Sequence, residues 1–439
     1  MKRYILSIAL GVFAVGAIGT YYASGTEGDV PQYKLVTLEG DALEAAKLRL
    51  DGHYIGGVGS KALELTVEGT KYQLTKSFYD KFFKYSRYLT THFEDLKALK
   101  REHRDFMRGR SSVNSFYRDS EWVIYADAVL YDPRSEYEWR TELRMDVLEE
   151  ATGKVAKHRI ELDESNRTEW ISVDDVQRIG DEVHILAQVR YRTGPSADGT
   201  DNPTMDFRDY VVDLSSGKLL REAVTVSEKL ESSTGNQGTV NAQKVSREIN
   251  LSAISSEVSS HPSEYVVLQT SRRETVDGEG DKETTTFIRN SAVYSYRTGK
   301  LTSLPEPATD YSAFSSEQNR LNGEQFTVMY SSNHSLAIVR YNVATGTLEP
   351  GELMLTAKQA GGQSFKSVIL AQDRVYALLS TKDLNKAGLA DSRQLTAIVL
   401  DAGSGKTLYR GEAAYAGPAE KAEEFRKNLW LNNVYADRS

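Results

Sequence analysis

One turn pattern recurs five times along this sequence and constrains its fold more than any other feature. In each copy an alternating apolar stretch runs into a Ser-, Thr- or Ala-rich turn with a glycine, and a second strand-like stretch follows. The turn glycines are Gly153, Gly217, Gly299, Gly346 and Gly405, and all but Gly346 are followed by lysine. Glycine reaches the positive φ that a tight hairpin turn needs at little steric cost. The pattern therefore predicts five antiparallel hairpins.

A second kind of hairpin precedes each of these five. Its expected turns lie at or near Asp119–Ser120, Gly180–Asp181, Pro262–Ser263, Asn322–Gly323 and Gln372–Asp373. Two successive hairpins supply four antiparallel strands, which is the content of one β-propeller blade. The strand–Thr-Gly-Lys–strand turns across residues 110–439 resemble those of quinoprotein-like and similar β-propeller repeats. A β-sandwich or another all-β fold is the alternative, because Ser/Thr-Gly-Lys makes a good hairpin turn in any β-protein.

The two ends of the chain are expected to supply one further blade. Residues 428–439 suggest a first hairpin that turns at Asn432–Asn433, without a second hairpin after it. Residues 62–74 suggest a second hairpin that turns at Glu68–Gly69, without a first one before it. A composite blade would join these halves and close a six-bladed ring over residues 33–439. Residues 33–54 either add strands to that blade or form part of a seventh.

Residues 76–108 break the strand pattern and predict a short helical insertion. Apolar residues recur there near helical spacing with charges between them, namely Phe82, Leu89, Phe93, Leu96 and Phe106. Residues 76–110 hold ten Lys and Arg against five Asp and Glu. These cations either meet anionic headgroups or wall polymers near a membrane, or they form an ordinary solvated helix face whose charges pair locally.

The first 23 residues predict export from the cytoplasm. Lys2 and Arg3 precede the uncharged run of residues 4–23, which as a helix is about 30 Å long and matches a bilayer core. The run is longer than the apolar part of a cleaved signal peptide, and Tyr21 spoils a cleavage site after Ala23. We therefore expect a retained single-pass anchor, a tether over residues 24–32 and an extracytoplasmic domain that follows the positive-inside rule. A cleaved signal peptide is the alternative.

Composition limits the chemistry that the chain can carry. It has no cysteine, which removes disulfides, thiolate metal sites, a cysteine nucleophile and lipid attachment at a lipobox. The net charge of −8 becomes −10 once Lys2 and Arg3 are set aside, so nucleic acid is not an expected partner. The Gly-Ser-Gly-Lys-Thr string at 403–407 lacks the first glycine of a phosphate-binding loop, because Leu400 stands there.

Two acidic segments are the candidate metal or contact sites. The segment around residues 198–209 looks like an acidic loop in which weak calcium binding is conceivable, and its candidate ligands are Asp198, Asp201, Asp206 and Asp209. The second segment contains Asp277, Glu279 and Asp281. It begins like a calcium loop, but Lys282 and Ile288 occupy positions where glycine and glutamate are needed, which favours a solvated hairpin tip. We expect these three residues to form a binding loop and expect no resident cofactor.

Catalytic signatures are missing from the sequence. No Gly-X-Ser-X-Gly elbow occurs, and the four tryptophans lack the common spacing of quinoprotein docking motifs. The leading hypothesis is a non-catalytic, membrane-anchored module that binds an envelope protein, peptide or glycan. The alternatives are an extracellular carbohydrate hydrolase or lyase with carboxylates at the axial face of the propeller, and a sensing or accessory subunit of a membrane complex.

Overall fold

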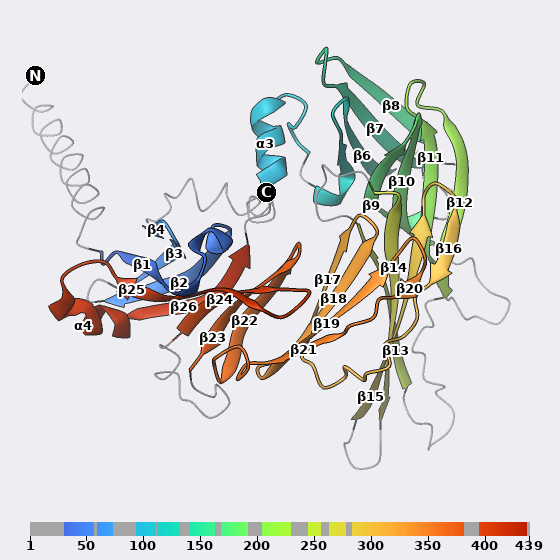
Figure 1. Ribbon diagram of the computed structural model, residues 1–439. Helices are drawn as coiled ribbons and strands as arrows, with labels where there is room; N and C mark the ends of the chain where they lie inside the picture. Colours follow the sequence, from blue (N-terminus) through green and yellow to red (C-terminus); the bar gives the residue numbers. More distant parts are fainter. Residues whose placement is uncertain are drawn as a thin grey trace, which may run out of the picture. The chain divides into compact units, whose positions relative to one another are not determined.

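The computed structural model describes residues 30–56, 59–72, 94–110, 112–131, 140–162, 168–191, 204–229, 245–255, 263–277, 283–381 and 395–436. Within these ranges the chain is almost entirely β, as predicted, and its strands form six antiparallel sheets (Figure 1). The chain divides into two compact units, which are described separately. Unit 1 comprises Met1–Arg87, Ser331–Leu336 and Leu355–Asp437, and unit 2 comprises Tyr88–Tyr330, Ala337–Met354 and Arg438–Ser439.

Unit 2 contains four sheets, each made from four consecutive strands in simple up-and-down order. The first sheet consists of β5 (Phe116–Arg118), β6 (Trp122–Tyr131), β7 (Arg140–Glu149) and β8 (Val155–Glu161). The second consists of β9 (Thr168–Ile179), β10 (Glu182–Tyr191), β11 (Thr204–Asp213) and β12 (Leu219–Lys229). The third sheet consists of β13 (Val245–Ile254), β14 (Tyr265–Asp277), β15 (Glu283–Ser295) and β16 (Lys300–Ser303). The fourth consists of β17 (Ser316–Asn322), β18 (Gln325–Ser331), β19 (Ser335–Asn342) and β20 (Thr347–Leu348), and a further strand, β21 (Leu353–Thr356), pairs with β19.

The five repeated glycine turns share one geometry, which confirms the hairpin prediction. Their glycines have φ between 66° and 72°, and each glycine N–H donates to the carbonyl four residues earlier at 2.8–2.9 Å. In four of the turns the side chain at that earlier position also accepts a backbone N–H, and these side chains are Asp213, Ser295, Asn342 and Asp401. The same local chemistry thus produces the same corner in five sheets.

The predicted first hairpins are confirmed at the level of strand pairing. Strand β5 pairs with β6, β9 with β10, β13 with β14, β17 with β18 and β22 with β23, all in adjacent positions. Gly180–Asp181 and Gln372–Asp373 form turns as expected, and Asp119–Ser120 lie in the short connection between β5 and β6. Asn322 is the last residue of β17, so that turn lies one residue later than predicted, at Gly323–Glu324. Pro262 lies outside the described residues.

Hydrophobic clusters join each sheet of unit 2 to the next. Side chains of β6, β7, β9 and β10 form one continuous core, which includes Ile124, Met145 and Ile185. A second cluster joins the β9–β12 sheet to the β13–β16 sheet, and a third joins the β13–β16 sheet to the β17–β20 sheet. The sheets therefore pack face to face in chain order, as propeller blades do.

Unit 1 contains the two sheets in which the chain ends meet. The first has the order β1 (Tyr33–Gly40), β25 (Thr407–Tyr415), β24 (Leu395–Asp401), β23 (Arg374–Ser380), β22 (Ser364–Ala371). The second has the order β26 (Leu429–Ala436), β2 (Leu48–Gly56), β3 (Gly59–Thr66), β4 (Gly69–Tyr72). Figure 1 shows the blue N-terminal strands beside the red C-terminal ones.

The composite sheet confirms the prediction in outline and corrects it in detail. The β3–β4 hairpin turns where expected, between Thr66 and Gly69. The hairpin predicted at Asn432–Asn433 is wrong, because β26 continues through both residues and pairs with β2 along its length. Two asparagines fit a turn locally, but the long-range ladder to β2 satisfies the backbone here, with a register shift opposite Asp51–Gly52. Residues 33–54 supply β1 and β2 to two different sheets; the described strands form no seventh sheet.

The helical insertion is confirmed for the part of it that can be described. Helix α3 covers Glu94–Glu102, and Leu99, Phe106 and Met107 pack with Phe116 and Val123 of the β5–β8 sheet. The other helices among the described residues are short: η1 (Ala42–Ala45), η3 (Val113–Ser115), η6 (Ala419–Lys421) and α4 (Ala422–Lys427). In the parts of the chain that the structure describes, no helix is both long and apolar enough to cross a bilayer, and residues 4–23 lie outside those parts.

Candidate functional site

A cavity of about 370 Å³ lies in unit 2 between the β13–β16 sheet and the β17–β20 sheet. Its walls come from β14, β15 and β16 on one side and from β17, β18 and β19 on the other, with Glu228 of β12 at its edge. The segment Leu304–Pro307, which follows β16, also lines it. This size and this mixture of polar and aromatic side chains are those of a small-ligand or side-chain pocket.

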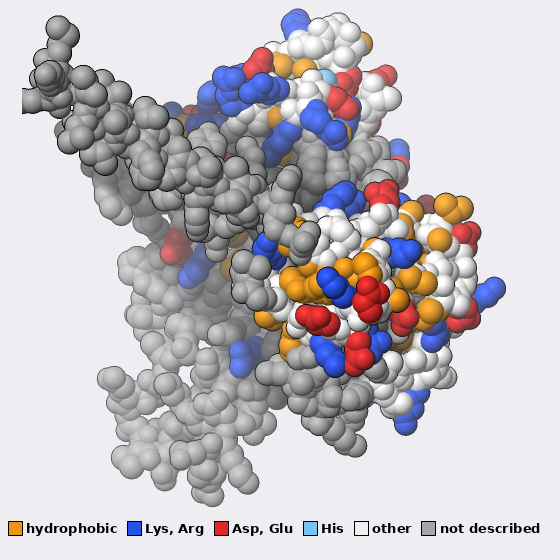
Figure 2. All heavy atoms as spheres, turned by 90° about the vertical axis from the view of Figure 1, so that its left-hand side faces the viewer, with side chains coloured by type: hydrophobic (Ala, Val, Ile, Leu, Met, Phe, Trp, Pro, Cys, Tyr) orange, Lys and Arg blue, Asp and Glu red, His pale blue; other side chains and the backbone are white. Residues whose placement is uncertain are grey.

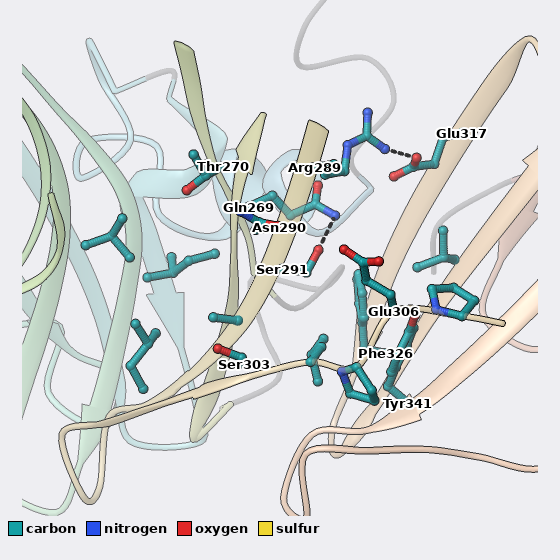
Figure 3. Close-up of a pocket in the computed structure, with 18 of the residues that line it drawn as sticks. Gln269, Thr270, Arg289, Asn290, Ser291, Ser303, Glu306, Glu317, Phe326 and Tyr341 are labelled. Carbon is teal, nitrogen blue, oxygen red and sulfur yellow. Dashed lines mark hydrogen bonds and ion pairs between the residues drawn. The ribbon is translucent and has the colours of Figure 1, made fainter. Parts of the chain in front are cut away.

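A row of polar side chains crosses the cavity from one sheet to the other (Figure 3). Gln269 donates through Nε2 to Ser291 Oγ at 3.1 Å and accepts through Oε1 from Asn319 Nδ2 at 3.2 Å. Asn319 also donates to Glu317 Oε1 at 2.9 Å, and Glu317 forms an ion pair with Arg289. The row thus fixes the orientation of Glu317 and engages most of its own hydrogen-bonding capacity.

Aromatic side chains form the apolar part of the wall. Phe326 and Tyr341 are buried, with ring centroids 5.8 Å apart. Tyr330 stacks on Tyr311 at 4.1 Å with nearly parallel rings. Burial raises the pKa of Tyr330 to about 12, against the opposing influence of Arg289. The phenol therefore stays neutral at any physiological pH.

Glu306 brings a further carboxylate to the cavity from a different direction. It lies between Pro305 and Pro307, and Figure 3 shows its side chain directed into the space between the two sheets. Burial and then the Glu306 charge raise the pKa of Tyr341, which indicates that the two groups are close. The cavity therefore combines one neutral polar row, an aromatic wall and an acidic group on a constrained segment.

Of the predicted calcium ligands, two can be located, and neither lies in a loop. Asp206 and Asp209 belong to strand β11 and are buried. Asp206 accepts from Ser227 Oγ at 2.7 Å and pairs with Arg208. The interpretation of these two residues as loop positions is wrong, because β11 begins at Thr204 and pairs with β10 along its whole length. Asp198 and Asp201 lie outside the described residues, so calcium binding by the segment stays a prediction.

Asp209 belongs to a buried polar network between two sheets of unit 2. Its Oδ2 lies 2.9 Å from His184 Nδ1 and accepts at 2.9 Å from the hydroxyl of Tyr294. The neighbouring Tyr296 hydroxyl donates to Asp175 Oδ2 at 2.6 Å. Tyr294 lies in β15 and Tyr296 directly follows its last residue, whereas Asp175 and Asp209 come from β9 and β11, so these bonds tie the two sheets together.

Burial sets the electrostatics of this network. It raises the pKa of Asp175 to about 6, although hydrogen bonds from Tyr296 and Gln177 oppose the rise. The adjacent Asp174 sits at a register shift in β9, and burial followed by the Asp175 charge raises its pKa to about 7. Asp175, His184 and Asp209 are at most 3% exposed. A ligand cannot reach them without a rearrangement, so we assign the network a structural role.

The predicted binding loop lies at the end of the β14–β15 hairpin. Asp277 is the last residue of β14 and pairs with Glu283 of β15, while Glu279 and Asp281 lie outside the described residues. The structure therefore places Asp277 at a hairpin end, as expected. No group of three or more potential metal ligands occurs among the residues that can be described.

Several charges of the basic segment are paired in the part of it that the structure describes. Arg110 pairs with Asp146, Arg108 with Asp105 at 3.4 Å, and His103 with Glu150 at 2.9 Å. On the face displayed in Figure 2, lysine and arginine side chains are interspersed with acidic and hydrophobic ones.

The cavity residues were missed by sequence reasoning because three separate strands supply them. Gln269, Arg289 and Glu317 carry no shared motif, and only the register of β14, β15 and β17 brings them together. One local signal was available. The chain has nine prolines, and two of them flank Glu306, which marks that acid as part of a rigid segment.

Comparisons with known proteins give no family. No protein-family model matches the chain, and no curated protein matches it significantly. Among solved structures it is similar to the Dos1 propeller, with TM-score 0.23 and 9% identity over 65% of this chain and 57% of that one. It is also similar to the WD40 domain of SCAP from fission yeast, with TM-score 0.23 and 8% identity over 64% and 74% of the two chains. A third similarity is to the periplasmic gluconolactonase PpgL of Pseudomonas aeruginosa, with TM-score 0.21 and 10% identity over 89% and 99%.

These similarities are too weak to carry an argument about function, and the match spans less than two thirds of the Dos1 chain. The assignment of the fold therefore rests on the sheets themselves. Their strand order, their repeated glycine corners and their face-to-face packing within each unit are those of propeller blades. The chain is an all-β, propeller-like protein.

Proposed function

We propose that this protein is a non-catalytic binding module of the cell envelope. Residues 4–23 would hold it in the membrane as a single-pass anchor, and residues 24–439 would lie on the extracytoplasmic side. The uncharged run of twenty residues after Lys2 and Arg3 supports this placement. The six sheets would be six blades, and the composite β26/β2–β4 sheet would be a blade built from both ends of the chain.

The observation that carries the proposal is the cavity between the β13–β16 and β17–β20 sheets. It presents hydrogen-bonding, charged and aromatic side chains to one space of about 370 Å³. Its polar row is fixed by internal hydrogen bonds, so a ligand would meet preorganised groups. Little of the binding free energy would then be spent on ordering these side chains. The partner we expect is an envelope protein or peptide, with a glycan as the other candidate.

The alternative is an extracellular carbohydrate hydrolase or lyase. It draws on one specific observation, which is that Glu306 and Glu317 reach the cavity from separate elements. Glu317 is held by Arg289 and Asn319, however, so this carboxylate is already engaged by other side chains. A general acid needs a raised pKa and a free proton, so the arrangement favours binding over catalysis.

A site-specific crosslink tests the proposed binding function. A photoreactive benzoylphenylalanine replaces Ser303, an exposed residue of the cavity wall, in the full chain in its own membrane. The matched control carries the same group at Val155, which is 38% exposed on β8 of another sheet. We expect a discrete crosslinked product from position 303 that is absent from position 155.

A second variant connects that product to the cavity. Ser291→Phe places a ring in the cavity, and we expect it to abolish the crosslink from position 303 while circular dichroism and the thermal midpoint show a folded protein. Equal products from positions 303 and 155 would contradict the binding function. Release of reducing sugar from wall polysaccharide that is lost in Glu317→Gln would favour the hydrolase instead.

A further inference from the structure

The cavity between the β13–β16 and β17–β20 sheets has a surplus of negative charge that its own ion pairs leave uncompensated. Three carboxylates line it, from Glu228, Glu306 and Glu317, against the single guanidinium of Arg289. Glu317 pairs with Arg289, and Glu228 pairs at 2.6 Å with Arg272 outside the lining. Among the described residues Glu306 forms no such pair, so its carboxylate is the charge left for a ligand.

We propose that this cavity takes a cationic group, namely the guanidinium or ammonium of a basic side chain on the protein or peptide partner. The inference rests on the proposed binding function and names the chemistry of its ligand. A volume of about 370 Å³ suits one extended side chain, at the small end of the range for ligand pockets.

The aromatic wall suits the same ligand. Tyr341 lies close enough to Glu306 for the carboxylate to influence its phenol, and Tyr330 shares the wall. A cation that pairs with Glu306 therefore enters a space bordered by neutral phenol rings, whose faces attract positive charge. Because the pKa of Tyr330 is raised to about 12, the ring keeps its neutral character at physiological pH.

The segment that carries Glu306 is preorganised. Proline fixes its own φ near −65° and restricts the residue before it, so Pro305 and Pro307 together limit the conformations open to Glu306. The adjacent Leu304 is buried, and its N–H donates to Ser291 O at 2.9 Å. The acid is thus held at the cavity edge before any ligand arrives, which lowers the entropic cost of forming the ion pair.

Other ligand chemistries match this lining less well. A sugar would find the Gln269 amide already engaged, because Gln269 bonds to both Ser291 and Asn319. An anionic ligand would have to take Arg289 from Glu317 and then face Glu306. A cation needs no such exchange, since it meets the one carboxylate without an ion pair.

Binding of small probes to the full-length protein in detergent micelles tests the proposal. The probe is Nα-acetyl-arginine N-methylamide, and its neutral isostere is the citrulline amide of the same length. By calorimetry we expect the arginine probe to bind saturably and the citrulline probe to bind with about tenfold lower affinity. The difference corresponds to the loss of one partly exposed ion pair and one cation–π contact. The affinity for the arginine probe should fall as salt rises from low to physiological concentration.

A pair of variants with the same charge change isolates Glu306. Glu306→Gln should lower the affinity for the arginine probe about fivefold, which is the effect expected from the loss of one partly exposed ion pair. Glu324→Gln alters an exposed acid outside the cavity, on the β17–β18 turn, and should change the affinity by less than twofold. Equal binding of the two probes, or equal losses in the two variants, would overturn the proposal.

The outcomes separate this inference from the function on which it rests. If the crosslink from position 303 persists while the arginine probe fails to bind, the binding function stands and the cationic ligand is wrong. If an N-acetylglucosamine oligomer binds in place of the arginine probe, the ligand is a glycan. If the crosslink and all probes fail, both proposals fall.

Discussion

Removal of one buried hydroxyl should weaken the contact between two sheets by an amount that depends on pH. Tyr296 is fully buried, and its hydroxyl donates to Asp175 Oδ2 at 2.6 Å. Tyr296→Phe keeps the ring and deletes this donor. A hydrogen bond to an ionised group contributes about 1.5–3 kcal/mol, and a bond between neutral groups contributes about 0.5–1.5 kcal/mol. The loss should therefore be about twice as large when Asp175 is ionised.

The pH dependence follows from the raised pKa of Asp175. Burial raises that pKa from 3.8 to about 6 in the folded protein, so the folded state holds a proton that the unfolded chain releases. The resulting stability is fully present below about pH 4 and is lost as pH rises through about 6, with an amplitude on the order of 3 kcal/mol. Because the Tyr296 hydroxyl stabilises the carboxylate, its removal should raise this pKa further and steepen the loss between pH 5 and 8.

Urea unfolding of the full-length protein at pH 5 and pH 8, followed by tryptophan fluorescence, measures both effects. Trp122 and Trp170 report on the β5–β8 and β9–β12 sheets. The control is Tyr265→Phe, which deletes the hydroxyl of a half-buried tyrosine on the neighbouring strand β14, and should change the free energy of unfolding by less than about 0.5 kcal/mol. A loss in Tyr296→Phe that is equal at the two pH values, or no larger than the control, would refute the reasoning.

Three further predictions concern the turns, the hairpin end and the anchor. Gly153→Ala and Gly217→Ala both place alanine at a positive φ near 68°, which costs about 1–2 kcal/mol of stability. Only at Gly217 would the new Cβ meet a side chain, that of His158 at 2.1 Å. The thermal midpoint should therefore fall further in Gly217→Ala than in Gly153→Ala, and equal shifts would contradict the packing argument. Deletion of 274–283 leaves three residues to connect the remaining paired strands. The midpoint of thermal unfolding should therefore change little, while capture of the partner should weaken. A global loss of stability would count against a contact role for this segment. The chain should remain in the membrane fraction after carbonate extraction, and protease added outside intact cells or spheroplasts should digest residues 24–439. Full protection from the protease would place the domain on the cytoplasmic side.

The repeated corners could be predicted because their cause is local. A glycine in a Thr- or Ser-rich turn between alternating stretches forces one backbone geometry wherever it occurs, and five such turns show φ within a few degrees of each other. Asn432–Asn433 shows the limit of the same logic. Those two residues suit a turn, but the ladder between β26 and β2 uses them as strand, and nothing near them in the sequence reveals that distant partner.

The cavity could not be predicted, because its parts depend on register between strands that are far apart in the chain. Gln269 meets Asn319 only after β14 and β17 have been placed in facing sheets. The error with Asp206 and Asp209 has the opposite origin. Dense acidic residues usually indicate a solvated loop, but here Ser227, Arg208, His184 and Tyr294 supply partners that make buried positions tolerable.

The pairing of the chain ends in unit 1 fixes the order in which the molecule can be completed. Each sheet of unit 2 comes from one continuous stretch and can assemble as soon as that stretch emerges, whereas β1 waits for β25 and β2 waits for β26. About 350 residues separate β4 from β26. At ordinary rates of synthesis β1 and the outer edge of β2 therefore stay unpaired for roughly 20–70 s, although β2, β3 and β4 can pair with one another. During that interval these open edges invite association with other chains, and a ribosome that stalls before Leu429 would release an incomplete chain whose β2 edge has no partner strand.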